Sequence, residues 1–286
     1  MKRSPDRQDE LTGSSGGTLL RNIRKRADRT QLWVEAEADI GTGYMQRIES
    51  GRVAQPERST LERILEALDA RYGERRDVLE RFGYVVFADP PDQAEIAWAR
   101  DVCAMEIAAL PFPAYALDCA FRLIAWNDLV PRLFGISPDH RAFRRLQEGW
   151  LLGSWFDPMS PLGRSVAQPE RYLPAMVRAA RFELQQLHAG PRYEAMLNEL
   201  AAELPQFRAY WEEGRRSPDP VMDARGLVPV NLDVPEAGPL HFRLSAEPFA
   251  RDPRFRLLSF FPADIPAMRW CDAEVRRSAA APAADS

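Results

Sequence analysis

The stretch "TQLWVEAEADIGTGYMQRIESGR", residues 30–52, contains two short helical patterns separated by a tight turn. Thr30 can cap the first helix with its hydroxyl group. Val34 and Ala38 follow at a spacing of four, which places them on one face of that helix. Asp39 is a residue type that tolerates the left-handed backbone conformation of a turn. The first half of the stretch therefore predicts a capped helix that ends in a turn.

The second half of the stretch predicts another helix, which ends at Gly51. Tyr44, Met45 and Ile48 form its inward face. Two short helices joined by a tight turn have the geometry that places the second helix in the major groove of DNA.

Three more helical patterns surround this pair. The first, "LLRNIRKRA", begins at Leu19 and combines an apolar face with four basic residues. The second, "STLERILEAL", predicts a capping box formed by Ser59 and Glu62. The third is "ERRDVLERFGY". The apolar residues expected in a shared core are Leu19, Leu20, Ile23, Leu61, Ile64, Leu65, Leu68, Val78, Leu79 and Phe82.

From about Leu19 to Leu68 the chain resembles the helix-turn-helix of the Cro/repressor class, often called the XRE family. The resemblance implies that the glutamine opening the first of the two paired helices touches a phosphate and that the first turns of the second face the bases. Gln can pair with adenine, Arg with guanine, and a Thr methyl group with thymine. The resemblance also implies that Glu49 pairs with an arginine of the helix that begins at Leu19. The implied DNA-contacting residues are Gln31, Thr42, Gly43, Tyr44, Gln46, Arg47, Arg52 and Arg58.

The sequence departs from the family pattern at two positions. Glu35 stands where alanine is usual, and Asp39 stands where glycine is usual. Gly41 and Gly43 also lower helix propensity at the start of the second helix. We therefore expect the second helix of the pair, the one that would face the bases, to be loosely held before DNA binds.

Composition restricts the remaining possibilities. The 286 residues favour two domains. Hydrophobic residues make up 45% and charged residues 28%, and no apolar run approaches the roughly 18 residues of a membrane helix. The N-terminus lacks the apolar core of a signal peptide, which predicts a cytoplasmic protein. Three cysteines without CxxC spacing indicate reduced thiols. The net charge of −4 means that any contact with nucleic acid needs a local basic patch.

Domain boundaries follow from the breaks in these patterns. The Gly/Ser-rich residues 1–17 predict a flexible arm. Residues 18–88 form the predicted DNA-binding domain, and the prolines at 90 and 91 mark its end. A second domain is expected over residues 89–270, followed by a disordered tail over 271–286.

The second half of the chain has the alternation of β-strands. "PAYALD", "FRLIAWN", "LHFRLSAEPFA" and "FRLLSFFPAD" alternate aromatic or branched residues with polar ones. A long helical interval, roughly Asp128 to Trp211, separates the second of these strands from the third. The pattern predicts an α+β domain whose antiparallel sheet is covered by helices on one face.

From Pro111 to Asp264 the chain resembles the MmyB-like ligand-binding domain, which has a PAS-like fold. The stretches that carry the resemblance are "PAYALDCAFRLIAWNDLVPRLFG", "YLPAMVRAARFELQQL", "ELPQFRAYWEEG" and "GPLHFRLSAEPFA". The sequence has "EEGRR" and "VPEAG" where the family usually carries a histidine and a His-Pro pair. The fold class expected for the chain is α+β, with a five-helix N-terminal domain and a PAS-like antiparallel sheet that carries a large helical insertion.

The resemblance implies a small apolar ligand, a fatty acid or a similar lipid, held in a cavity between sheet and helices. Arg178 and Arg181 could pair with its carboxylate, or with Glu183 or Glu203. Aromatic residues at these spacings also suit a solid core, so both readings stay open. The candidate ligand-binding residues are Tyr115, Leu117, Leu123, Trp126, Phe134, Met176, Arg178, Arg181, Phe182, Phe242, Leu244, Phe249 and Phe261.

Other functions have less support in the sequence. It contains no GxSxG, HExxH, P-loop or GxGxxG motif, so we expect no enzyme. A haem sensor using His188 is one alternative, and a protein-interaction or dimerisation module with an empty PAS-like domain is another. The prediction is a bacterial transcription regulator that binds double-stranded DNA and a small apolar ligand as a homodimer. We expect no membrane partner, no metal and no cofactor beyond a bound fatty acid.

Overall fold

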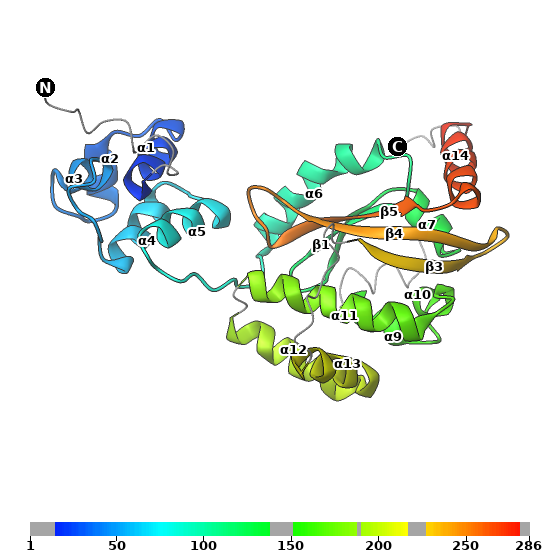
Figure 1. The fold of residues 1–286 in the computed structure, drawn as a ribbon. Helices are drawn as coiled ribbons and strands as arrows, with labels where there is room; N and C mark the ends of the chain where they lie inside the picture. The colour runs from blue at the N-terminus through cyan, green and yellow to red at the C-terminus, as the bar shows by residue number, and fades with distance from the viewer. Residues whose placement is uncertain (1–14, 138–150, 188–189, 217–226, 281–286) are drawn as a thin grey trace, which may run out of the picture. The chain divides into compact units, whose positions relative to one another are not determined.

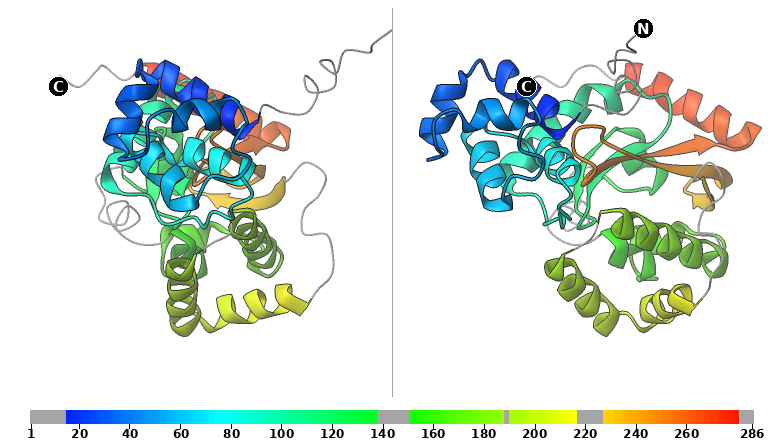
Figure 2. Two further views of the ribbon diagram at one scale, coloured as in Figure 1. Left: turned by 90° about the vertical axis from the view of Figure 1, so that its left-hand side faces the viewer. Right: turned by 60° about the vertical axis from the view of Figure 1, so that its left-hand side comes forward.

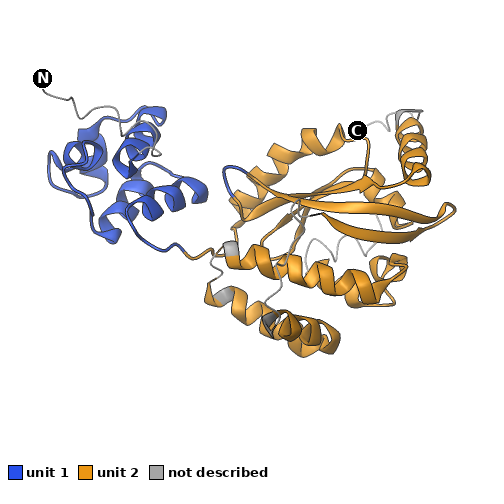
Figure 3. Ribbon diagram, in the orientation of Figure 1, with its two compact units in different colours: residues 1–86, 250–252 blue, residues 87–249, 253–286 orange. Residues whose placement is uncertain are grey.

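A computed structural model describes residues 15–137, 151–187, 190–216 and 227–280. The described residues belong to two compact units (Figure 3). The first comprises the chain up to Val86 together with Ala250–Asp252. The second comprises Phe87–Phe249 and the chain from Pro253 onward. The boundary between the two units, at Val86 and Phe87, thus lies close to the proline pair at 90 and 91.

The first unit is built from five helices around one core. They are α1 (Gly16–Arg26), α2 (Gln31–Glu37), α3 (Tyr44–Glu49), α4 (Arg58–Ala67) and α5 (Tyr72–Arg81), labelled in Figure 1. Thr30 caps α2 as predicted, because its Oγ1 accepts a hydrogen bond from the Trp33 amide at 3.1 Å. Of the apolar residues expected in the core, Leu19 is partly buried and the others are all buried there.

Two details of this unit differ from the sequence-based expectation. Gly16 and Gly17 are buried in α1, which Ser15 caps, so the helix includes residues assigned to the flexible arm. A side chain at Gly17 would place its Cβ 2.3 Å from the Ile48 carbonyl oxygen, so glycine is needed for the close contact of α1 with α3. The second difference is at α4, whose N-cap is Glu57, so the Ser59 capping box does not form.

The second unit contains a five-stranded antiparallel sheet in the order β2-β1-β5-β4-β3. The strands are β1 (Ala114–Asp118), β2 (Leu123–Trp126), β3 (Val228–Val234), β4 (Gly238–Pro248) and β5 (Phe255–Pro262). The helical segments between β2 and β3 are the predicted insertion. The α+β, PAS-like fold class is therefore confirmed.

Strand β3 was absent from the prediction. Its sequence, "VPVNLDV", alternates in burial as a strand should, but Pro229 and Asn231 are typical of loops. The strand lies at the edge of the sheet, where a proline removes no ladder hydrogen bond that the sheet needs.

Helices cover both faces of the sheet, whereas the sequence predicted one covered face. Helix α6 (Gln93–Ala108) packs on one side, where Cys103 belongs to the same apolar cluster as Ala114 and Ala116 of β1. On the other side lie α9 (Leu151–Phe156), α10 (Pro161–Ser165) and α11 (Pro169–Gln186) (Figure 1). Strand β1 is buried on both faces, so the side facing α6 is apolar too and needs its own cover.

The remaining helices extend these layers. Short α7 (Leu129–Leu133) follows β2. Helices α12 (Pro191–Glu203) and α13 (Pro205–Arg216) form an outer layer beyond α11 (Figures 1 and 2). Among the described residues, no helix is long and apolar enough to cross a membrane.

The C-terminal segment corrects another expectation. Residues 271–280 were assigned to a disordered tail, but they belong to helix α14 (Ile265–Ala280). This helix packs on β4 and β5, and the Trp270 ring lies 6.4 Å from the ring of Phe242. Its buried apolar residues are Ala267, Trp270 and Cys271. The three cysteines are buried and form no disulfide.

Candidate functional site

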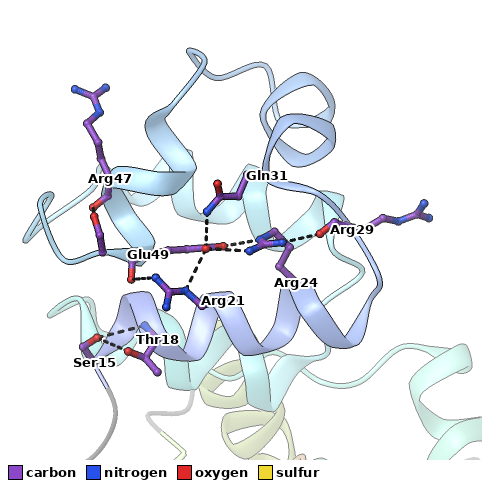
Figure 4. A network of polar contacts seen from close by, with 9 residues as sticks. Ser15, Thr18, Arg21, Arg24, Arg29, Gln31, Arg47 and Glu49 are labelled. Atoms are coloured by element: carbon purple, nitrogen blue, oxygen red, sulfur yellow. Dashed lines mark hydrogen bonds and ion pairs between the residues drawn. The ribbon is translucent and has the colours of Figure 1, made fainter.

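Helix α3 divides into a buried face and an exposed face. Met45 and Ile48 are completely buried, and Tyr44 is half-buried against the same core. Gln46 and Arg47 are exposed, as is Thr42 just before the helix. The Arg47 guanidinium lies over the Tyr44 ring at 5.1 Å. It points away from the polar network below α3 (Figure 4). Three of the predicted base-contacting residues, Thr42, Gln46 and Arg47, are therefore exposed to solvent.

The polar network on the other side of α3 is centred on Glu49, whose side chain is fully buried. Arg24 of α1 donates to both carboxylate oxygens, at 2.6 and 3.0 Å. Arg21 Nε lies 3.4 Å from Oε2. Figure 4 shows these contacts. The predicted pairing of Glu49 with an arginine of the first helix, α1, is thus confirmed. This pairing joins α1 to the end of α3.

Gln31 also belongs to this network. Its Nε2 donates to Glu49 Oε2 at 2.7 Å, so the side chain predicted to touch a phosphate positions α3 in the structure. Burial by itself would raise the pKa of Glu49. The hydrogen bonds from Arg24 and Gln31, together with the charges of Arg24 and Arg21, outweigh that effect and lower the pKa below its usual value.

Glu35, one of the two departures from the family pattern, has a structural task. Its side chain is buried, and Oε1 accepts a hydrogen bond from the Met45 amide at 2.9 Å. Gly43 is the N-cap of α3, with φ of +80°, and offers no side-chain cap. Glu35 thus supplies the missing acceptor from a neighbouring helix. Asp39 adopts the predicted left-handed conformation, with φ of +49°. These contacts are not those of a loosely held helix.

We predict that Glu35→Ala destabilises the first unit by about 1–2 kcal/mol, the usual cost of losing a helix cap. Amide exchange at residues 44–47 should accelerate, because the first turn of α3 frays. Glu35→Gln keeps an acceptor oxygen and should stay close to wild type. Hydrogen exchange measured by mass spectrometry checks this, and unchanged protection of α3 in Glu35→Ala would refute the capping role.

The two predicted phosphate contacts outside α3 differ in their surroundings. Arg52 is exposed. Arg58 is exposed as well, but its Nε donates to Glu62 at 2.8 Å and its Nη1 donates to the Val85 carbonyl oxygen at 3.2 Å. Arg52 is thus the better placed of the two to contact a DNA backbone.

The second unit contains a small apolar cavity between the sheet and helices α9 and α11. Its volume is about 60 Å³. The strands contribute Tyr115, Leu117, Leu244 and Leu258, and the helices contribute Trp155 and Met176 among others. A much smaller adjoining cavity is lined by Leu123 and Phe134. Pockets for drug-sized ligands span roughly 300–1,000 Å³, so this one is too small for such a ligand as it stands.

One ion pair forms part of the lining of the cavity. Arg256 of β5 and Glu183 of α11 both line it, and Arg256 Nη1 is 2.5 Å from Glu183 Oε2. The guanidinium also lies 4.5 Å from the ring centroid of Phe121. Burial raises the pKa of the Glu183 carboxyl, and the charge of Arg256 opposes that rise.

Tyr172 adds a hydroxyl group to the lining. The residue is 3% exposed, and its hydroxyl has no hydrogen-bond partner among the described residues. Burial raises the pKa of Tyr172 well above its usual value, so the phenol stays neutral and can donate. An unpaired buried hydroxyl favours a ligand with an acceptor group.

The structure separates the predicted ligand-binding residues into two groups. Tyr115, Leu117, Met176 and Leu244 line the main cavity. Arg178 is exposed, Phe182 is 39% exposed, and Arg181 Nη1 donates to the Trp211 carbonyl oxygen of α13. Helix α11 therefore turns these three away from the sheet, which corrects the prediction for them.

The remaining predicted aromatic residues pack elsewhere. Phe249 stacks near Phe255 on the α6 side, and Phe261 contacts Phe112. Phe242 is a core residue between Phe260 and Trp270. Trp126 is half-buried and lines neither cavity. His188, the haem candidate, lies outside the described residues. Among the described residues, no cluster of acidic, histidine and cysteine side chains could hold a metal ion.

Sequence reasoning missed Arg256, and it named Glu183 only as an alternative partner of Arg178 or Arg181. A signal for Arg256 was present, because "FRLLSFF" alternates and places Arg256 on the same face as Leu258 and Phe260. Glu183 pairs instead with Arg256, which lies far along the chain.

Comparison with known families agrees with this architecture. Residues 104–272 match the model of the MmyB-like transcription regulator ligand binding domain, and residues 17–79 match a helix-turn-helix domain. The first match spans more than half of the chain, so the protein belongs to the MmyB-like family. It is a DNA-binding regulator with a ligand-sensing domain.

No curated protein matches the chain. Among solved structures, "Structure of an RNA-binding Light-Oxygen-Voltage Receptor" matches with a TM-score of 0.25 and 9% sequence identity. The match covers 97% of this chain and 70% of the other. A likeness this distant supports no comparison of function.

Proposed function

We propose that the protein is a sequence-specific transcription regulator that senses a fatty acid or a similar lipid. The observation that carries the ligand proposal is the apolar cavity between α11 and the sheet, with Arg256 in its lining. It acts as a homodimer, in which two copies of α3 enter half-sites about one helical turn apart. Gln46 and Arg47 contact base edges, and Arg52 contacts the phosphate backbone.

The small size of the cavity suggests how sensing is coupled to structure. A long acyl chain needs more than about 60 Å³, so α9 and α11 must separate from the sheet to admit it. A ligand that binds the opened arrangement better than the closed one shifts the population between them. The domain would signal through the position of its helical layer.

Base recognition is tested by Gln46→Ala and Arg47→Ala. Each should weaken binding to the preferred sequence by about 1–3 kcal/mol and relax the preference at one base pair. Arg52→Ala is the matched control, because loss of a phosphate contact weakens all sequences alike. A binding-selection assay on the full chain measures both effects. Unchanged sequence preference in Gln46→Ala and Arg47→Ala would show that α3 does not contact bases.

Lipid binding is tested by mass spectrometry of the denatured, purified protein and by thermal shifts with fatty acids of varied length. We expect a co-purifying lipid or a stabilisation that grows with ligand concentration, about 2.7 kcal/mol at a hundred times Kd. Neither a bound lipid nor a thermal shift with any chain length would overturn the lipid proposal and leave the DNA-binding role intact.

A further inference from the structure

Arg256 is the arginine whose guanidinium lines the cavity, and this guanidinium is already paired with a carboxylate of the protein. Among the described residues lining the cavity, Arg256 and Glu183 carry the formal charges, and each neutralises the other at 2.5 Å. Arg256 comes from the middle of the sheet and is 5% exposed. Glu183 comes from α11, so the ion pair ties the helical layer to the sheet.

The surroundings hold Arg256 in place. One side of the guanidinium faces the Phe121 ring. Phe121 has φ of +59°, a left-handed conformation that is rare for a bulky residue and costs of the order of 1 kcal/mol or more. Strain of this kind persists where the surrounding structure enforces it, often beside a ligand. The Phe121 carbonyl oxygen also accepts from the Leu151 amide at 2.9 Å, which links this turn to α9.

We propose that Glu183 occupies the place of a ligand headgroup, and that the carboxylate of an acyl ligand replaces Glu183 on Arg256. This inference rests on the lipid-binding function proposed above and adds the chemistry of the headgroup. The exchange conserves the charge pairing of Arg256, because one carboxylate takes the position of another. It also breaks the tie between α11 and β5, which the cavity needs in order to open.

The neighbouring groups fit this exchange. The Glu183 side chain is 24% exposed, so it can turn to water when displaced, whereas Arg256 at 6% side-chain exposure cannot leave. An unpaired buried guanidinium is costly, so a ligand without an anionic group gains nothing by displacing Glu183. The Tyr172 hydroxyl, which has no partner among the described residues, can donate to the second carboxylate oxygen.

The test compares a fatty acid with the fatty alcohol of equal chain length on the full-length, delipidated protein. Wild type should bind the acid about tenfold or more tightly than the alcohol, since a charge-assisted pair outweighs a neutral hydrogen bond. Glu183→Gln removes the competing carboxylate, so acid affinity should rise about tenfold while alcohol affinity stays nearly constant.

A double variant guards against misfolding caused by an unpaired charge. Arg256→Met with Glu183→Gln leaves no buried ion behind, and it should still bind the alcohol but lose the preference for the acid. Arg178→Met, an exposed change on the same helix, is the control and should behave like wild type.

Equal affinity of wild type for acid and alcohol, or a preference that survives in the double variant, would overturn the exchange while leaving lipid binding in place. Binding of neither compound would overturn the lipid-binding function as well.

Discussion

Replacing Glu49 by alanine should lower the free energy of unfolding of the helix-turn-helix unit by about 3 kcal/mol. The carboxylate is fully buried and holds Arg24, Arg21 and Gln31 together. Its loss leaves Arg24, which is 11% exposed, without its anion. DNA binding should fall with stability, because the same residue joins α3 to α1. Amide exchange over residues 15–86 of the full chain, followed by mass spectrometry, measures the change.

The control for Glu49 is a surface ion pair of the same unit. Arg58 and Glu62 are 45% and 41% exposed, so Glu62→Ala should cost less than about 1 kcal/mol. A cost for Glu49→Ala no larger than that of Glu62→Ala would show that the buried network is not what holds α3.

The lowered pKa of Glu49 also predicts a pH dependence. A carboxyl group whose pKa is lower in the folded than in the unfolded state stabilises the fold above the unfolded pKa. That stability is lost as the pH falls through the folded pKa. Wild type and Glu49→Ala should therefore differ fully near neutral pH and converge below the ordinary carboxyl value of 4.5. A difference that stays constant into acid would contradict the assignment.

Gly17→Ala should destabilise the same unit by about 2–3 kcal/mol and weaken DNA binding. The added Cβ would lie 2.3 Å from the Ile48 carbonyl oxygen, a backbone atom that cannot move without shifting α3 against α1. The better helix propensity of alanine, about 1 kcal/mol, offsets only part of this cost. Chemical denaturation of the full chain measures the effect.

Gly41→Ala is the matched control, because no atom lies within 4 Å of the Cβ that it would add. We expect its stability to stay within about 0.5 kcal/mol of wild type. If the two alanine variants were equally stable, the close contact of α1 with α3 would not be needed.

The helical unit could largely be predicted from local patterns. Thr30 sits directly before the helix it caps, and apolar residues such as Ile64 and Leu65 recur at helical spacing. Such signals depend on neighbours a few positions apart. The edge strand β3 escaped prediction because Pro229 lowers strand propensity, while only its place at the edge of the sheet makes a proline tolerable there.

The candidate ligand site was harder to predict. The sequence showed that aromatic and apolar residues are abundant in the sheet and in α11. Which of them line the cavity depends on the face of the sheet to which each strand residue points and on the orientation of α11 about its own axis. Tyr115 faces the cavity, whereas Phe261 faces away from it. Arg178 and Arg181 were plausible anchors by residue type alone, but α11 turns them outward.

By itself, the sequence of this protein determined the helix-turn-helix, the α+β second domain and the family to which both belong. Helix caps, the spacing of apolar residues and short motifs depend on residues close together in the sequence, so they can be recognised without knowledge of the fold. Only the tertiary structure decided that Glu35 caps α3, that Gly17 must lack a side chain and that Arg256 meets Glu183. Each of these joins separate elements whose contact depends on how helices dock and strands register.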